Sequence, residues 1–146
     1  MAKHYIEEDW LKPMQKMEIG DKLTTKSRMI ARSEVELMVL LAGEYVPQFV
    51  SEEAARANGW KTQLVPGPLS LSIAYGLLMQ SGFLKDVIAY MGTSDMRFIA
   101  PVYIGDSIRA EVEVTSKKKT DKGWIGEYDW AIINQDGVAV GKGHNI

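Results

Sequence analysis

Two kinds of hydrophobic spacing divide the chain, and they predict helices in its first part and strands in its last part. Residues 69–82 are of helical length and contain no charged residue. A Pro-Gly-Pro segment comes just before them and Gly82 ends them, and proline at the start with glycine at the end favours a helix. Because this helix is apolar all round, we expect it to be buried on most sides.

After this helix the spacing changes to an alternating one, which is typical of strands. The clearest case is residues 108–114, where apolar and charged side chains alternate as in a strand with one face in water. We expect a hairpin turn at residues 134–137 and Pro101 at a strand end or bulge. The runs that give the four or five expected antiparallel strands are at residues 87–91, 96–102, 108–114, 124–133 and 138–143.

The chain before the apolar helix predicts an arm, one strand and two helices. Residues 1–21 are expected to form an N-terminal arm, and residues 22–30 a first strand after a Gly-Asp turn. Ser33, followed by acidic residues, predicts a helix start, and Gly43 its end. A second short helix is expected to begin at Ser51 and to end near Gly59 by the same logic.

This order of elements predicts a single α+β domain over residues 1–146, with an antiparallel sheet wrapped around one long central helix. The net charge of −2 gives no indication of nucleic-acid binding. The absence of cysteine and the presence of only 2 histidines argue against a metal centre, and no cofactor motif is found. No apolar run is long enough to span a membrane, and residues 1–8 lack the apolar core of a signal peptide, so we expect a cytoplasmic protein.

One short segment carries the candidate chemistry: Ala-Gly-Glu-Tyr-Val-Pro-Gln-Phe, between the first two predicted helices. It resembles the active-site motif of the MaoC-like, R-specific enoyl-CoA hydratases and dehydratases, Gly-Asp-x-Asn-Pro-x-His. Gly43 and Pro47 match this motif. Glu44 stands at the Asp position, Val46 at the Asn position and Phe49 at the His position.

Two further segments resemble the same family and occur in the family's order. Ile-Gly-Asp at residues 19–21 is similar to the turn before the first strand. Residues 97–106 are similar to the segment Arg-Phe-x-x-Pro-Val-x-x-Gly-Asp that follows the central helix. The resemblance covers nearly the whole chain from about Met17 onward, and it implies the hotdog fold.

The resemblance implies a reaction in which water is added reversibly to a 2-enoyl-CoA. In the family, the Asp and His of the motif activate one water, a task that needs one group to take a proton and one to give it. Glu44 is the candidate acid/base, whereas Phe49 can neither accept nor donate a proton. His4 and His144 do not match the family's pattern, and the sequence leaves open whether either approaches the site.

The resemblance also implies where a substrate is held. In the family, backbone N–H groups at the start of the central helix bind the thioester carbonyl, where a His-Gly pair commonly stands. Here the pair is Pro-Gly, and the N–H of the glycine keeps this capacity through its hydrogen bond and the helix dipole. The candidate substrate-binding residues are Tyr45, Phe49, Pro66, Gly67 and Ser70.

Some of these residues have a simpler explanation. Phe49 is suited to packing as well as to stacking on a ligand, and Glu44 is also consistent with a solvated residue just past a helix end. The hydroxyls of Ser70, Ser72 and Tyr75 are expected to bond to local backbone or neighbouring chains, with substrate contact as the alternative.

Three functions remain open from the sequence. The first is an acyl-CoA hydratase or dehydratase that uses Glu44, and the second is an inactive hotdog subunit that pairs with an active homologue or binds acyl-CoA. The third is a hotdog thioesterase, which generally needs a carboxylate on or just before the central helix; the nearest here is Asp86, beyond it. The implied ligand is an acyl thioester of CoA, or of acyl carrier protein. A homodimer or a heterodimer with a homologous chain is expected, because a single hotdog sheet leaves a long free edge.

Overall fold

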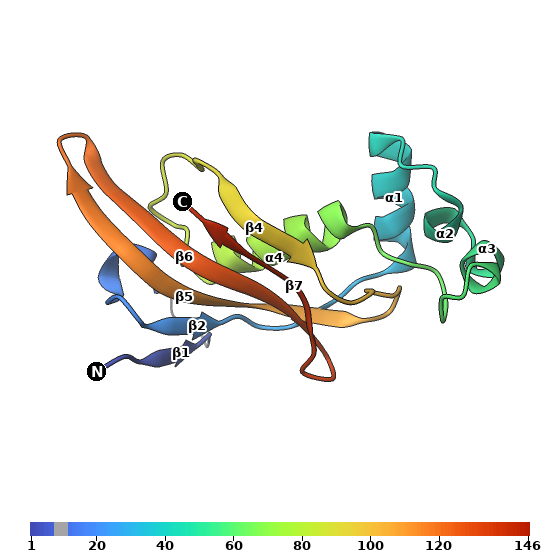
Figure 1. The fold of residues 1–146 in the computed structure, drawn as a ribbon, viewed down its shortest axis with the longest axis horizontal. Helices are drawn as coiled ribbons and strands as arrows, with labels where there is room; N and C mark the ends of the chain where they lie inside the picture. Colours follow the sequence, from blue (N-terminus) through green and yellow to red (C-terminus); the bar gives the residue numbers. More distant parts are fainter. Residues whose placement is uncertain (8–11) are drawn as a thin grey trace.

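One long helix lies along the inner face of a curved sheet in the computed structural model, which describes residues 1–7 and 12–146 (Figure 1). This arrangement confirms the predicted α+β fold. The strands are β1 (His4–Ile6), β2 (Lys22–Thr24), β3 (Arg28–Met29), β4 (Thr93–Phe98), β5 (Ser107–Thr120), β6 (Gly123–Asn134) and β7 (Ala139–Asn145). The helices are α1 (Arg32–Ala42), α2 (Pro47–Val50), α3 (Glu52–Ala57) and α4 (Gly67–Gln80), with a 3-10 turn at Met14–Lys16. None of these helices, within the described residues, has both the length and the apolar character needed to cross a bilayer.

The sheet has the strand order β1-β2-β5-β6-β7-β4, and β3 pairs separately with β5. Its antiparallel core is the pair of long strands β5 and β6, followed by the predicted hairpin into β7. The expected single strand over residues 22–30 is wrong, because β2 and β3 are separate. Between them the Thr25 hydroxyl accepts a hydrogen bond from the Ala110 N–H (2.9 Å), which replaces a regular ladder bond by a side-chain one.

The structure adds detail in one other segment and departs from the expected pattern in another. The N-terminal arm contains a strand, β1, which pairs in parallel with β2. Asp21 fixes this pairing, since its buried carboxylate accepts hydrogen bonds from the N–H groups of Glu18 (2.9 Å) and Lys3 (2.8 Å), which lower the pKa of Asp21. The apolar run at residues 87–91 forms no strand and lies exposed on the surface. Trp10 and Leu11, which were assigned to the arm, lie outside the described residues.

The helix ends follow from capping chemistry. Gly43 ends α1 with φ 71°, and the Ser51 hydroxyl accepts from the Ala54 N–H (3.1 Å) to begin α3, both as predicted. However, α1 begins at Arg32 and not after Ser33, because the Glu34 carboxylate accepts the Ala31 N–H (3.0 Å). This N–H and the Arg28 guanidinium lower the pKa of Glu34.

Helix α4 was expected to be buried on most sides, and among its residues only Pro68, Ser72, Met79 and Gln80 are exposed. Ser70, Ala74, Leu77 and Leu78 are buried, and the helix contacts β5 and β6. Met79 remains exposed on the other side of the helix.

A buried amide ties α4 to the sheet. Asn145, at the end of β7, is 0% exposed and accepts a hydrogen bond from Trp130 Nε1 (2.9 Å). Its Nδ2 donates to the hydroxyls of Tyr128 (2.9 Å) and Tyr75 (3.2 Å), the latter on α4. Burial raises the pKa of both tyrosines. The Trp130 indole and the Tyr128 hydroxyl bond to this one amide, whereas the Tyr75 hydroxyl also lies 3.5 Å from the Tyr90 hydroxyl.

We expect Asn145→Ala to lower the free energy of unfolding by roughly 1–3 kcal/mol or more, because it leaves buried polar groups without partners. Urea unfolding, with Asp136→Ala in the exposed hairpin turn as the control, measures the effect. Equal stability of the Asn145 and Asp136 variants would show that the network contributes nothing.

Candidate active site

A pocket of about 300 Å³ opens at the start of α4. Gly67 and Ser70, two of the predicted substrate-binding residues, lie in its wall together with Phe98 from the end of β4. The remaining walls are almost wholly apolar and come from the segment before α4 and the segment after β4. These remaining lining residues are Trp60, Leu64, Val65, Ile99, Ala100, Pro101 and Val102.

The ring of Phe98 packs directly against Gly67. A Cβ at this position would lie 2.7 Å from the nearest Phe98 ring carbon, so the half-exposed ring would have to shift. Gly67 is the first residue of α4, and its N–H has no hydrogen-bond acceptor among the described residues. Since Pro68 has no N–H, the helix start presents this one donor beside the pocket, with the positive end of the helix dipole behind it.

The pocket's hydroxyl is already engaged. Ser70 is buried, and its Oγ donates to the Gly67 carbonyl (2.8 Å). This is the local backbone bond expected for a serine on a helix. Ser70 therefore shapes the wall of the pocket and supports the turn that presents the Gly67 N–H.

Glu44 lies in a tight turn between α1 and α2. Its Oε2 is buried and has no hydrogen-bond partner among the described residues. The turn is held by hydrogen bonds from the N–H of Tyr45 to the Gly43 carbonyl (2.9 Å) and from the N–H of Val46 to the Glu44 carbonyl (2.8 Å). A buried carboxylate oxygen without a donor is unfavourable, so this atom is suited to accept a hydrogen bond from a bound molecule.

The other predicted site residues are spread around these two features. Phe49 is half-buried and packs against the main core, Tyr45 is exposed, and Pro66 is buried just before α4. Glu44, Tyr45 and Phe49 do not line the pocket that Gly67 and Ser70 share. Within one chain, the structure thus brings two of the predicted residues together and keeps the acid/base candidate on a separate segment. The two segments are joined by a hydrogen bond from the Leu64 N–H to the Gln48 carbonyl (3.0 Å).

Sequence reasoning missed several residues of this region. Much of the apolar wall comes from Trp60, Phe98 and Ile99. Phe98 and Ile99 lie in the segment at residues 97–106 that resembles the family, but no sequence pattern pointed to Trp60. Ser72 is exposed on α4, and Tyr75 bonds to Asn145. Neither lines the pocket.

The family model described as MaoC like domain matches residues 14–129. The chain belongs to the MaoC-like domain family. It is 33% identical over 105 residues to the (R)-specific enoyl-CoA hydratase of Aeromonas caviae, a match that covers 72% of this chain and 76% of that protein. It is 31% identical over 121 residues to protein MaoC of Klebsiella aerogenes. The matched residues make up 80% of this chain but only 35% of that protein. A solved structure described as the monoamine oxidase regulatory protein from Archaeoglobus fulgius is 28% identical with a TM-score of 0.81, covering 99% of this chain and 94% of that one.

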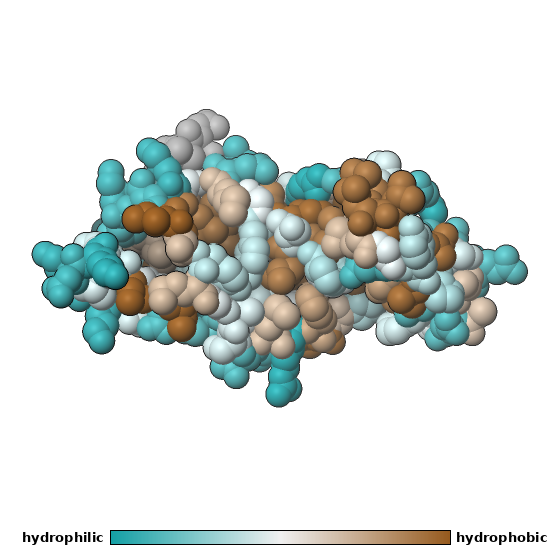
Figure 2. Space-filling view, turned by 90° about the horizontal axis from the view of Figure 1, so that it is seen from above, coloured by the Kyte–Doolittle hydropathy of each residue, from teal (hydrophilic) through white to brown (hydrophobic). Residues whose placement is uncertain are grey.

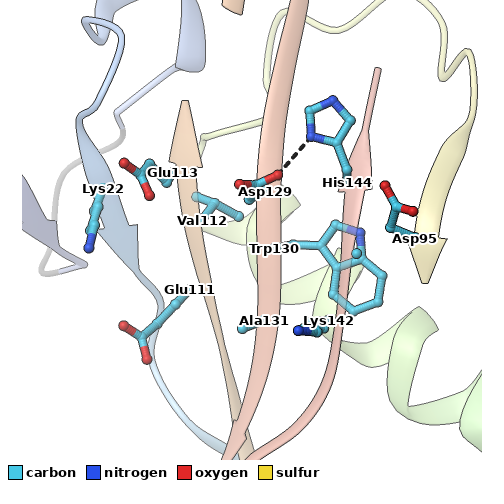
Figure 3. Close-up of a pocket in the computed structure, with 11 residues that line it drawn as sticks. Lys22, Asp95, Glu111, Val112, Glu113, Asp129, Trp130, Ala131, Lys142 and His144 are labelled. Atoms are coloured by element: carbon cyan, nitrogen blue, oxygen red, sulfur yellow. Dashed lines mark hydrogen bonds and ion pairs between the residues drawn. The ribbon is translucent and has the colours of Figure 1, made fainter. Parts of the chain in front are cut away.

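Neither histidine of this MaoC-like chain lies in the Gly67 pocket. His4, on β1, is hydrogen-bonded to the Thr24 hydroxyl (2.6 Å). His144 lies on the outer face of the sheet, in a second pocket of about 480 Å³, with Asp129 Oδ1 at 2.7 Å from its Nδ1 (Figure 3). Glu127 Oε1 lies 3.0 Å from its Nε2. Among the described residues, no group of three or more His, Cys, Asp or Glu side chains is arranged to hold a metal ion.

The two carboxylates around His144 favour its charged form. Hydrogen bonds with Glu127 and then Asp129 raise the pKa of His144, and the bond with His144 lowers the pKa of Glu127. The raised histidine pKa means that its stabilising contribution is complete below about pH 6.5, the unfolded value, and is lost as the pH rises through the folded value.

We therefore expect the free energy of unfolding to fall from about pH 6.5 upward as His144 loses its proton. The variant His144→Gln should show a flatter pH dependence over this range. Urea unfolding at several pH values between about 5.5 and 9 measures this. A wild-type curve that parallels that of the variant would contradict the assigned ion pair.

The Gly67–Phe98 contact gives a second expected outcome. Gly67→Ala should lower the free energy of unfolding by roughly 1–3 kcal/mol through overpacking. Placing Phe98→Leu in the same chain should recover part of this loss, because a smaller side chain leaves room for the new methyl group. A double-mutant cycle by urea unfolding measures the coupling, and strictly additive effects would contradict a direct contact.

Proposed function

We propose that this chain hydrates 2-enoyl thioesters, or dehydrates 3-hydroxyacyl thioesters, with Glu44 as its acid/base. The observation that carries the proposal is the unpartnered Gly67 N–H at the start of α4, beside an apolar pocket. A thioester carbonyl placed there accepts a hydrogen bond at the positive end of a helix. Both effects stabilise the negative charge that forms on this oxygen during the reaction.

The residues suggest how hydration proceeds. As the oxygen of water bonds to the β-carbon of the enoyl group, the Glu44 carboxylate takes a proton from that water. The electron pair of the double bond moves toward the thioester carbonyl, whose oxygen is held by Gly67. The carboxyl of Glu44 then returns the proton to the α-carbon, so one group both takes and gives the proton that the family's motif divides between two residues.

We also propose that the active unit contains two copies of the chain. Among the described residues, strand β4 lies at one edge of the sheet, pairs only with β7 and is exposed at every position. Such an edge favours pairing with a second copy. Exposed hydrophobic residues gather over the end of the molecule that carries α1, as Figure 2 shows, and include Leu40 and Leu41.

A second function is supported by position 49. Phe49 packs against the core, where the family's motif has a proton-transferring histidine. A chain of this kind is suited to bind an acyl thioester as the inactive partner of a homologue that retains both groups. Co-purification from the native source of a MaoC-like chain with the complete Gly-Asp-x-Asn-Pro-x-His motif would favour this second function over a self-sufficient enzyme.

We expect the purified protein to hydrate crotonyl-CoA or a longer 2-enoyl-CoA faster than the uncatalysed reaction. Glu44→Gln should lower kcat by roughly 10²- to 10⁴-fold, because the amide takes up no proton. The control is Glu53→Gln, which removes an exposed carboxylate from α3. Loss of absorbance of the conjugated enoyl thioester measures the rate.

Two results would contradict the enzymatic proposal. One is hydration at the uncatalysed rate across a panel of acyl lengths, with tight binding of the same thioesters pointing to the inactive subunit. The other is a Glu44→Gln variant as active as the Glu53→Gln control.

A further inference from the structure

The side chain of Gln63 connects the segment that carries Glu44 to the approach to α4. Gln63 is 1% exposed, and both ends of its amide are used. Its Oε1 accepts a hydrogen bond from Arg32 Nη1 (2.6 Å), and its Nε2 donates to the Phe49 carbonyl (2.7 Å). A buried amide is stable only when it is paired in this way.

The two partners of Gln63 lie on either side of Glu44 in the sequence. Arg32 is the first residue of α1, and Phe49 lies in α2. One side chain therefore holds both ends of the segment at residues 32–49. Between these ends, α1 is anchored by the buried Val35 and Val39, and the tight turn after it presents Glu44.

Gln63 is itself fixed with respect to the pocket. Its carbonyl accepts the Ile104 N–H (3.2 Å), and the Val65 N–H donates to the Val102 carbonyl (2.8 Å). Val65 and Val102 line the pocket at the start of α4, and Gly67 follows two residues after Val65. A displacement of the Gln63 amide is thus a displacement of the Glu44 segment relative to the Gly67 N–H.

We propose that Gln63 is a positioning residue that sets the Glu44 segment relative to the start of α4. The proposal rests on the proposed function for its catalytic consequence, but the positioning itself is measurable without substrate. The amide suits this task because it offers an acceptor to Arg32 and a donor to a backbone carbonyl at the same reach. Glutamate keeps only the acceptor, and methionine keeps the length with neither.

The first test measures position directly. Backbone hydrogen exchange at residues 43–50 should become about tenfold faster or more in Gln63→Met, because a buried hydrogen bond to this segment is lost. Gln63→Glu should accelerate the same residues, since the contact with Phe49 is lost while that with Arg32 remains. The matched control is Asn145→Ala, which removes another fully buried amide and should leave residues 43–50 unchanged relative to the rest of the chain.

The second test measures the catalytic consequence. In Gln63→Glu, kcat for enoyl-CoA hydration should fall roughly 10- to 100-fold, since small displacements of a reacting group have effects of this size. KM should change little, because the Gly67 pocket is kept. The folded fraction of Asn145→Ala should keep the wild-type kcat.

The outcomes separate the two proposals. Faster exchange at residues 43–50 in a chain without hydratase activity would support the positioning role and overturn the proposed reaction. Unchanged exchange in Gln63→Glu, or equal acceleration in Asn145→Ala, would overturn the positioning role whatever the activity. If Gln63→Met fails to fold, Gln63→Glu alone decides the question.

Discussion

The start of α4 is fixed by the packing of the Phe98 ring against the backbone of Gly67. This contact is closest with a glycine, because a Cβ would force the Phe98 ring to shift. It also joins the exposed edge of the sheet, where β4 ends, to the N-terminus of the buried helix. The pocket and its single backbone donor follow from this arrangement, since Phe98 forms one wall and Gly67 supplies the N–H. A charge-stabilising N–H beside an apolar cavity is the part of a thioester site that needs no side-chain chemistry.

The proton transfer that we propose depends on a different part of the chain. Helices α1 to α3 form a unit beyond the end of the sheet, and this unit carries Glu44 (Figure 1). Phe49, in the same unit, contributes to packing where a histidine would have to be kept polar and partnered. The unit therefore gains apolar contact and loses one proton-transfer group. In the proposed reaction, the Glu44 carboxylate acts without a second proton-transfer group, so its position matters more. The hydrogen bonds of Gln63 are important because they hold the segment that carries Glu44.

Local chemistry made much of the fold predictable. The charge-free run that became α4, the alternation of β5 and the turn after β6 each depend on near neighbours in sequence, as do the ends at Gly43 and Ser51. The failures depend on distant partners. β1 forms because Asp21 and β2 hold it, β2 is interrupted by a hydrogen bond to Ala110, and α2 is too short for its periodicity to be read. The apolar run at residues 87–91 was expected to be a strand, but it is an exposed surface segment.

The candidate site was predictable only in part for the same reason. Gly67 and Ser70 lie in the first turn of α4, whose start was clear from the sequence, and both line the same pocket. The side chain of Gln63 forms hydrogen bonds with Phe49 and Arg32, which lie 14 and 31 positions away in the sequence. No local sequence pattern reveals such contacts. The most direct measurement of the account is a crystal structure of the protein with a bound, unreactive enoyl-CoA analogue. The account predicts the thioester oxygen within hydrogen-bond distance of the Gly67 N–H, the acyl chain against Phe98 and a Glu44 carboxylate facing the β-carbon. A thioester bound elsewhere, with the Gly67 N–H making no contact with it, would contradict the account.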